Sequence, residues 1–324
     1  MLVAFLALPE CFRRDEQIKV VENFIARGVD GMVLAPLDDK ALVRPVETAG
    51  KADIPVVIID SGLQTDNYAS FVATDNALGG RMGGARLGKL LGGKGNVLLL
   101  RYAVGSASTT KREQGFLDEM KENFPGIKVL SSNQYAGATR DLAYTVSQNL
   151  LSRYGNEVNG IFCPNESVTV SMTKAVRDIG KAGGMVKIIG FDTSVQSLRD
   201  LKSGDVAGLV VQNPVKMGYL GVMTLVEHLG GKAVAKRGIL GNQHLGDAVD
   251  PGRGLPGCSG RSPGTEHGHV AQPGGGGDSL GGGVHRRGTG RGSGGVRRPP
   301  EIPDLRAPYV QPTERRRGKR RFTY

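Results

Sequence analysis

Two aspartates stand directly after apolar runs, at positions from which a carboxylate can reach a bound molecule. Asp60 follows the run Pro55–Ile59, and Asp192 follows the run Met185–Phe191. Such continuous apolar runs predict buried parallel strands, and open α/β sheets bind ligands at the carboxyl ends of their strands. An acid after a strand can equally cap the next helix or turn, so the residues alone leave both interpretations open.

Two further polar side chains fall near a predicted helix start and a predicted strand end. Arg112 lies in the predicted helix 106–123, where a solvent-exposed charge is the more common role on spacing alone. Asn165 follows the predicted strand 158–163 and could be a turn residue. If these side chains faced a crevice, fixed donors would stand opposite ionised acceptors, and such pairs make strong, orientation-selective hydrogen bonds.

The elements that must position these residues alternate between strand and helix along the chain. This alternation predicts an α/β fold of two Rossmann-like lobes with parallel sheets covered by helices. Lobe one is expected at residues 13–101 and lobe two at residues 102–212. Segment 213–237 carries a helix without a sheet partner in lobe two, so it should complete lobe one. Short strands are also expected at residues 2–8 and, edge-like, at 71–74.

The C-terminal part of the chain differs in composition from the rest. The chain has 324 residues and a net charge of +11, but 14 Lys and Arg against 7 Asp and Glu fall from Ile239 onward. The same 86 residues contain 21 glycines and 9 prolines and show no strand or helix periodicity. Such a composition cannot bury enough apolar surface to offset the entropy of ordering, so residues 238–324 are predicted to be a disordered tail.

Several chemistries find little support in the sequence. The cysteines Cys11, Cys163 and Cys258 show neither metal-ligand spacing nor a disulfide framework. Cys163 could be a nucleophile, but the only histidine before the tail, His228, lies on the last predicted helix. The glycine-rich segment 88–95 precedes a strand and has Gly95 where a phosphate loop needs Ser or Thr. No catalytic group, metal site or cofactor is therefore expected.

Targeting signals are also weak. No apolar run reaches the roughly 18–20 residues that a membrane span needs. The start of the chain, residues 1–8, lacks the basic residues and the cleavage site of a secretory signal, so no signal peptide is expected.

Seven segments, in order, resemble one protein family. They are Glu16–Ile18 with Asp30–Pro36, Ile54–Asp60, Lys111–Phe116, Phe162–Glu166, Gly190–Asp192 and Val211–Pro214. Over about residues 13–237 the chain resembles the sugar-binding proteins of bacterial ABC importers, the ribose-binding-like group of type I periplasmic binding proteins. The resemblance implies two lobes that hold a monosaccharide in the cleft between them.

The same resemblance implies which residues bind the ligand. Carried over by position, they are Asp60, Ser61, Arg112, Asn165, Asp192 and Gln212. Ser61 stands where the family has an arginine. The family's N-terminal strand and helix, whose aromatic rings stack on the sugar, have no counterpart, and the C-terminal tail is unrelated to the family's last crossing segment.

The function expected from this resemblance is that of a substrate-binding component of a sugar ABC transporter. Such a protein is not an enzyme, is a periplasmic monomer, and delivers its ligand to a membrane permease with its ATPase. The alternative is the ligand-sensing domain of a LacI-type transcription regulator, which would need a helix-turn-helix that residues 1–13 cannot contain. Nucleic-acid binding through Arg286–Arg291 would be weak and non-specific, because aromatic residues are not interleaved there.

Overall fold

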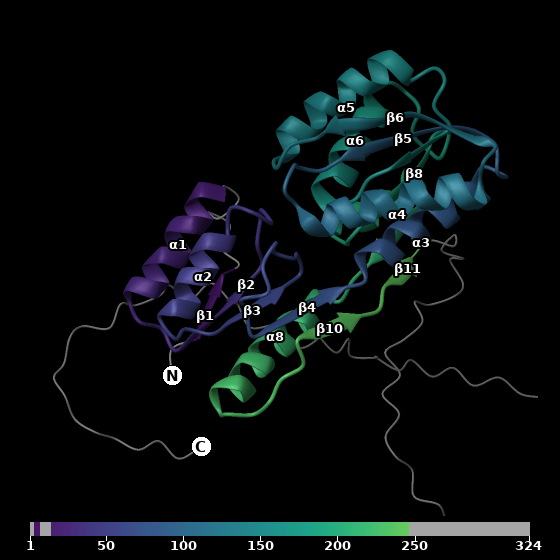
Figure 1. Cartoon of the computed structure of the whole chain (residues 1–324). Helices are drawn as coiled ribbons and strands as arrows, with labels where there is room; N and C mark the ends of the chain where they lie inside the picture. The colour runs from purple at the N-terminus through teal and green to yellow at the C-terminus, as the bar shows by residue number, and fades with distance from the viewer. Residues whose placement is uncertain (1–2, 7–13, 246–324) are drawn as a thin grey trace, which may run out of the picture. The chain divides into compact units, whose positions relative to one another are not determined.

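The computed structural model describes residues 3–6 and 14–245, and it confirms the predicted α/β fold of two lobes (Figure 1). The first sheet has the strand order β1-β2-β3-β4-β10, and the second has the order β11-β9-β8-β7-β5-β6. Every pairing of neighbouring strands is parallel except that of β11 with β9. The strands of lobe one are β1 Val3–Leu6, β2 Gly31–Leu34, β3 Val56–Ile59, β4 Ser70–Thr74 and β10 Arg237–Leu240.

Lobe one is covered by the helices α1 Arg14–Ala26 and α2 Val43–Lys51 on one face and by α8 Pro214–Leu229 on the other (Figure 1). Alternate strand residues serve the two faces, as the pleat requires. Met32 and Ile58 pack in the core beneath α1 and α2, whereas Val33 packs with α8. Helix α8 approaches the sheet closely at Gly221, where a Cβ would lie only 2.7 Å from Ile59. The lack of a side chain at this position allows the close packing. Helix α8 therefore packs on the sheet of lobe one.

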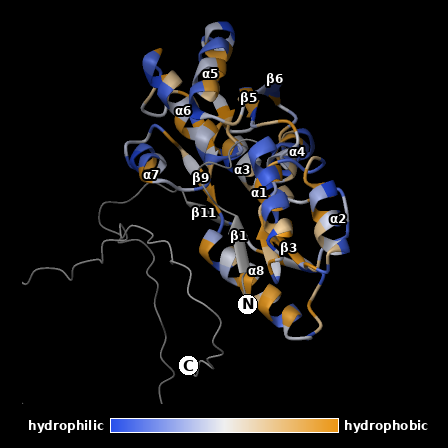
Figure 2. Cartoon of the chain, turned by 90° about the vertical axis from the view of Figure 1, so that its left-hand side faces the viewer, coloured by the Kyte–Doolittle hydropathy of each residue, from blue (hydrophilic) through white to orange (hydrophobic). Residues whose placement is uncertain are grey.

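Helix α8 is also the most continuously apolar helix of lobe one. No charged residue falls between Lys216 and Glu227, and Figure 2 shows hydrophobic colour along much of the helix. Its inner side buries Met217 and Leu225, while Tyr219 remains exposed. Within the described part of the chain, no helix combines the length and apolarity needed to cross a bilayer.

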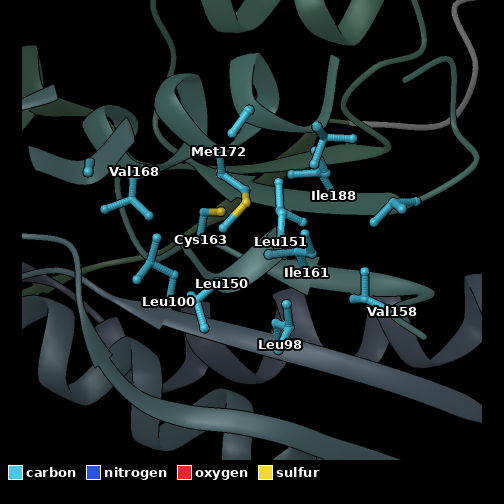
Figure 3. Close-up of a cluster of buried hydrophobic side chains, with 14 of the residues drawn as sticks. Leu98, Leu100, Leu150, Leu151, Val158, Ile161, Cys163, Val168, Met172 and Ile188 are labelled. Atoms are coloured by element: carbon cyan, nitrogen blue, oxygen red, sulfur yellow. The ribbon is translucent and has the colours of Figure 1, made fainter. Parts of the chain in front are cut away.

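Lobe two is built from a second, larger set of elements. Its strands are β5 Gly95–Arg101, β6 Ile127–Tyr135, β7 Gly160–Phe162, β8 Lys187–Phe191, β9 Gly208–Val211 and β11 Gln243–Leu245. Its helices are α3 Asn76–Leu90, α4 Ala107–Asn123, α5 Arg140–Tyr154, α6 Glu166–Asp178 and α7 Val195–Lys202. Helices α5 and α6 cover one face of the sheet, and α3 and α4 cover the other. Figure 3 shows the first of these cores, with Cys163 next to Met172 among leucine and isoleucine side chains.

The predicted boundary between the lobes, at residues 101 and 102, is wrong. Helix α3 and strand β5 belong to lobe two, because α3 packs against α4 and β5 pairs with β6 and β7. The α3–α4 contact is very close: a Cβ on Gly80 would overlap the carbonyl oxygen of Arg112, and one on Gly115 would overlap that of Ala77. The chain therefore leaves lobe one directly after β4.

The prediction that residues 238–324 are disordered is wrong for residues 238–245. Strand β10 pairs with β4 in lobe one, and β11 pairs with β9 in lobe two. Strand β4 is therefore an interior strand, and not the edge-like strand expected at residues 71–74. The rest of the tail, including Arg286–Arg291, lies outside the described residues. The strand predicted at residues 2–8 is confirmed as β1, which pairs in parallel with β2.

Three segments connect the lobes: Thr74–Asn76, Val211–Pro214 and Leu240–Gln243. Two of them are bonded to each other, since the Asp75 N–H donates to the Leu240 carbonyl at 3.1 Å. The Asn242 side-chain amide donates to the Asp75 carbonyl at 2.6 Å. The third crossing thus exists, although the sequence predicted a tail in its place.

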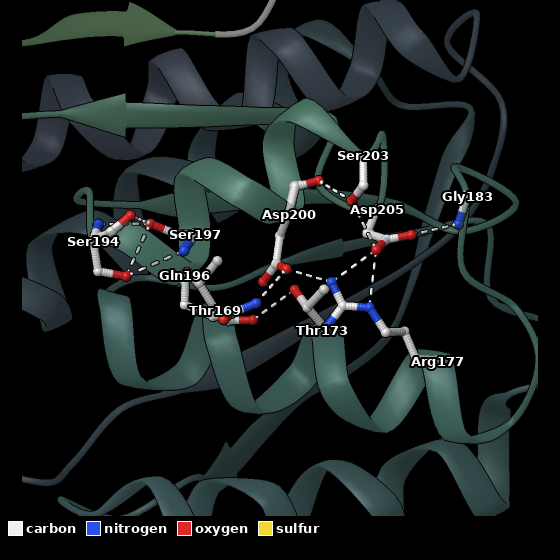
Figure 4. A network of polar contacts seen from close by, with 10 residues as sticks. All are labelled: Thr169, Thr173, Arg177, Gly183, Ser194, Gln196, Ser197, Asp200, Ser203 and Asp205. Carbon is white, nitrogen blue, oxygen red and sulfur yellow. Dashed lines mark hydrogen bonds and ion pairs between the residues drawn. The ribbon is translucent and has the colours of Figure 1, made fainter.

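A network of charged side chains joins α6 to α7 in lobe two (Figure 4). Arg177 of α6 forms ion pairs with Asp200 and with Asp205, at 2.7 Å to the latter. Asp205 also accepts from the Gly183 N–H at 2.8 Å, and these donors hold the pKa of its carboxyl below the usual range despite its burial. The network stabilises the packing of these helices and does not reach the crossing segments.

Candidate functional site

A cavity of about 180 Å³ lies where the two lobes meet, next to the crossing segments. All six residues that the sequence predicts as ligand contacts line it, namely Asp60, Ser61, Arg112, Asn165, Asp192 and Gln212. Its remaining walls are Pro36, Leu37, Tyr102, Ser106, Ser108 and Thr109. A larger cavity of about 580 Å³ between β6 and α5 contains none of the predicted residues.

Asp60 follows β3 and presents a carboxylate that accepts no hydrogen bond from residues 3–6 and 14–245. Its φ of 62° lies in the left-handed region, a conformation that costs energy in a residue other than glycine. Among the described residues none donates a hydrogen bond to this carboxylate, so the helix-capping interpretation is wrong here. Burial raises the pKa of Asp60, Arg112 opposes the shift, and Asp192 adds to it. An acceptor of this kind is ready for a donor on a ligand.

Asp192 follows β8 in a similar conformation, with a φ of 66°. Its Oδ1 accepts a hydrogen bond of 2.7 Å from the Gln212 amide, and its Oδ2 lies 3.7 Å from Arg112. The next helix, α7, is capped by Ser194 instead, so capping is not the role of this acid either. Both of these neighbours, Gln212 and Arg112, line the cavity themselves.

Arg112 is 2% exposed, so the interpretation as a solvated helix charge is wrong. Its Nε donates to Asn76 Oδ1 at 2.7 Å, and its Nη1 donates to the Pro164 carbonyl at 3.0 Å. The guanidinium lies 3.9 Å from the centre of the Phe191 ring. These contacts hold a buried cation in one orientation, because they use its donors and its face together.

Asn165 and Gln212 have defined structural partners as well. Asn165 caps α6: its Oδ1 accepts from the Val168 N–H at 3.3 Å. Asn165 is therefore a helix cap and not the turn residue that the sequence suggested, and it also lines the cavity. Gln212 lies in the second crossing segment, and its Oε1 accepts from the Thr74 hydroxyl at 2.8 Å.

Ser61 connects the lobes across the cavity. Its hydroxyl oxygen accepts from the Ser108 N–H at 3.2 Å, in the first turn of α4. The N-cap residue of α4, Ser106, makes no side-chain capping bond, so lobe one supplies the partner for that helix start. Nearby, the Asp39 N–H donates to the Gly105 carbonyl at 2.8 Å. Both bonds require the lobes to be closed upon each other.

The site as a whole can bind but offers little for covalent chemistry. Its charged groups are two carboxylates and one guanidinium, surrounded by hydroxyl and amide groups. Within residues 3–6 and 14–245, no cluster of three or more His, Cys, Asp or Glu could hold a metal ion. Cys163 is fully buried, and burial raises the pKa of its thiol far above its usual value, so it is not an activated nucleophile.

The sequence interpretation missed Asn76, the residue that bonds Arg112. Asn76 is 5% exposed and occupies the first position of α3. A polar residue at a helix start is usually explained by the helix itself, and only Asp75 beside it does the capping. No local pattern marks an asparagine whose partner lies 36 residues away.

A family model for the periplasmic binding protein domain matches residues 3–233. The chain belongs to the periplasmic binding protein family. Members of this family are solute-binding proteins of ABC importers, and the resemblance given above to the ribose-binding-like group is confirmed.

Curated relatives of this family member bind sugars or sugar alcohols by name. The ribose import binding protein of Haemophilus influenzae is 31% identical over 222 residues, covering 68% of this chain and 73% of that protein. The D-ribose/D-allose-binding protein of Pseudomonas aeruginosa is 31% identical over 223 residues, covering 67% and 68%. The xylitol-binding protein of Mycolicibacterium smegmatis is 29% identical over 197 residues, which span 61% of this chain and 55% of that protein.

Solved structures of the family confirm the two-lobed fold. A carbohydrate transporter solute-binding protein from Agrobacterium radiobacter, in complex with D-arabinose, matches with a TM-score of 0.69 and 31% identity, covering 74% of this chain and 82% of that one. A solute-binding protein from Agrobacterium vitis with bound D-fucose matches with a TM-score of 0.68 and 33% identity, covering 72% and 80%. The LacI-type alternative gains no support from these relatives.

Proposed function

We propose that this chain is the substrate-binding component of a sugar ABC importer and binds one monosaccharide in the cavity between its lobes. One observation carries the proposal. The cavity brings together two strand-end carboxylates, one of which accepts no hydrogen bond from the described part of the chain, and a guanidinium that is already fixed in orientation. A monosaccharide presents neighbouring hydroxyl groups, each of which can donate to a carboxylate and accept from a guanidinium.

The proposed roles follow from the donor and acceptor atoms of each side chain that the described residues leave available for a ligand. Asp60 accepts from sugar hydroxyls with both oxygens, and Asp192 accepts with Oδ2 while Oδ1 remains bonded to Gln212. Arg112 donates through Nη2, for which no protein hydrogen bond is seen among the described residues. Ser61, Asn165 and Gln212 complete the wall with smaller polar groups. Charge-assisted bonds of this kind are short and directional, so they select hydroxyl geometry.

The remaining parts of the proposal concern the partners and the cellular place. The bound sugar is delivered to a membrane permease with its ATPase, and the protein acts as a periplasmic monomer without catalysis of its own. Closure of the lobes, held in part by the Ser61–Ser108 bond, would present the ligand-bound form to the permease.

Isothermal titration calorimetry with a panel of pentoses, hexoses and pentitols tests this function. A saturable, one-to-one heat signal for at least one compound, absent for sugar phosphates, supports it. Nucleotides and amino acids serve as control ligands. If no monosaccharide or pentitol in the panel gives heat or raises the melting temperature, the proposed function is wrong.

A further inference from the structure

Two of the crossing segments are joined to the cavity by a closed ring of polar contacts. The ring runs from Asn76 to Arg112, Asp192, Gln212, Thr74 and back to Asn76. Its contacts measure 2.7, 3.7, 2.7, 2.8 and 3.2 Å in that order. Three members line the cavity, whereas Thr74 and Asn76 do not.

Each member of the ring is oriented by its neighbours. The Thr74 hydroxyl donates to Gln212 Oε1, which leaves the Gln212 amide N–H₂ to face Asp192. The Asn76 N–H₂ donates to the Thr74 carbonyl, which leaves its oxygen to face Arg112. Reversing either amide would place donor against donor and acceptor against acceptor, so the ring has one satisfied arrangement.

Three of the five members of the ring are removed from water, whereas Asp192 and Gln212 at the cavity are partly exposed. Thr74 is 3% exposed, Asn76 is 5% exposed and Arg112 is 2% exposed. Polar groups in such surroundings interact strongly, and a group that loses its partner there keeps the full cost of desolvation. A substitution at Thr74 or Asn76 should therefore change the orientation of the side chains that line the cavity.

We infer that Asn76 and Thr74 are positioning residues, which set the orientation of Arg112 and Asp192 for the ligand from the crossing segments. Asn76 holds the guanidinium through Nε, and Thr74 holds Asp192 through Gln212. Because both lie at the first crossing, the geometry of the site depends on the geometry of the hinge. This inference rests on the proposed function for the identity of the ligand, but not for the orientation of the arginine.

The test compares three single variants within the same crossing segment. Asn76→Ala removes the contact to Arg112, and Thr74→Val removes the hydroxyl while keeping the shape of the side chain. Asp75→Ala is the matched control, since Asp75 caps α3 through the Leu78 N–H at 2.9 Å and belongs to no part of the ring. Affinity for the sugar found with the wild type is measured by calorimetry, and stability by thermal melting.

We expect Asn76→Ala and Thr74→Val each to weaken sugar binding about tenfold, since each removes a hydrogen bond within a charged network. Asp75→Ala should lower the melting temperature but leave the dissociation constant within about twofold. Equal affinity of all three variants and the wild type would overturn the inference, as would an equal loss in the Asp75 control.

A second readout needs no sugar. The Nε–H resonance of Arg112 in ¹⁵N-labelled protein should exchange slowly with solvent in the wild type and in the Asp75 variant, and rapidly in Asn76→Ala. If the wild type binds no sugar, the proposed function fails while this signal still decides the inference. Slow exchange retained in Asn76→Ala would show that Asn76 does not hold the arginine.

Discussion

Replacing Asp60 with asparagine removes one negative charge from the cavity and changes little else. The left-handed conformation at this position, with a φ of 62°, is one that asparagine adopts as readily as aspartate. Alanine would add backbone strain, so Asp60→Asn is the cleaner variant. The fold should remain intact, and the difference in ligand affinity should report the carboxylate alone.

The expected loss follows from the free carboxylate of Asp60. Hydrogen bonds to charged groups contribute about 1.5–3 kcal/mol each, and an amide oxygen replaces them only in part. The dissociation constant for the sugar should therefore rise about 10- to 150-fold. In the absence of sugar the variant should be as stable as the wild type at neutral pH or more stable, because burial of the Asp60 charge opposes folding.

The pH dependence of sugar binding tests the role of the Asp60 charge independently. Burial raises the pKa of Asp60 in the ligand-free protein, and sugar hydroxyls that donate to the carboxylate would favour its ionised form. Binding should then lower this pKa and release protons, so wild-type affinity should fall as the pH drops through the raised pKa. In Asp60→Asn this component should vanish. A raised folded pKa also means that the wild type loses stability, relative to the variant, as the pH rises through it.

Calorimetric titrations of both proteins between pH 4 and pH 8 measure these quantities. Titrations in two buffers of different ionisation enthalpy count the protons released. An unchanged dissociation constant in Asp60→Asn, or the same pH profile in both proteins, would show that the Asp60 carboxylate does not bind the sugar.

Three further predictions concern the scaffold. Gly80→Ala should destabilise the protein by about 3 kcal/mol or more, since the new Cβ would overlap the Arg112 carbonyl. Gly50→Ala, at an open position of α2, should be neutral or slightly stabilising, and urea unfolding compares the two variants. Deleting residues 238–324 should lower the melting temperature by about 5 °C relative to deleting residues 246–324, because only the longer deletion removes β11 and all of β10 except Arg237. Equal melting temperatures of the two variants would contradict the role of these strands. Ser61→Ala should destabilise the closed form by about 1 kcal/mol through loss of the bond to Ser108, and a larger mean distance between fluorophores on the two lobes would report this. Ser106→Ala should leave that distance unchanged, because the Ser106 side chain makes no capping bond to α4.

Much of the fold could be predicted from local pattern. The apolar runs before Asp60 and Asp192 are buried strands, and the alternation of strands and helices gives two parallel sheets. The assignment of elements to sheets could not be predicted in the same way. Strand β5 continues the alternation without a break, and its pairing with β6 and β7 shows that it belongs to lobe two. Strands β10 and β11 are short, and their partners lie far away in the sequence.

For the candidate site, too, the residues could be predicted but their contacts could not. Family resemblance predicted six residues, and the fold gathers all of them around one cavity. What they do there depends on contacts that no local pattern shows. Arg112 can be buried because Asn76 and Pro164 accept hydrogen bonds from its N–H groups and Phe191 covers its face. The Ser61 hydroxyl accepts a bond from the other lobe, a role that its type permits but that only its position in the fold reveals.

A crystal structure of the protein with the best sugar from the calorimetric panel tests the location of the binding site. We expect one monosaccharide in the cavity between the lobes, with hydroxyl groups within hydrogen-bond distance of Asp60, Arg112 and Asp192. We also expect the bonds from Arg112 to Asn76 and from Gln212 to Asp192 to be kept. A sugar bound elsewhere, for example between β6 and α5, with the interlobe cavity free of it, would contradict this binding site.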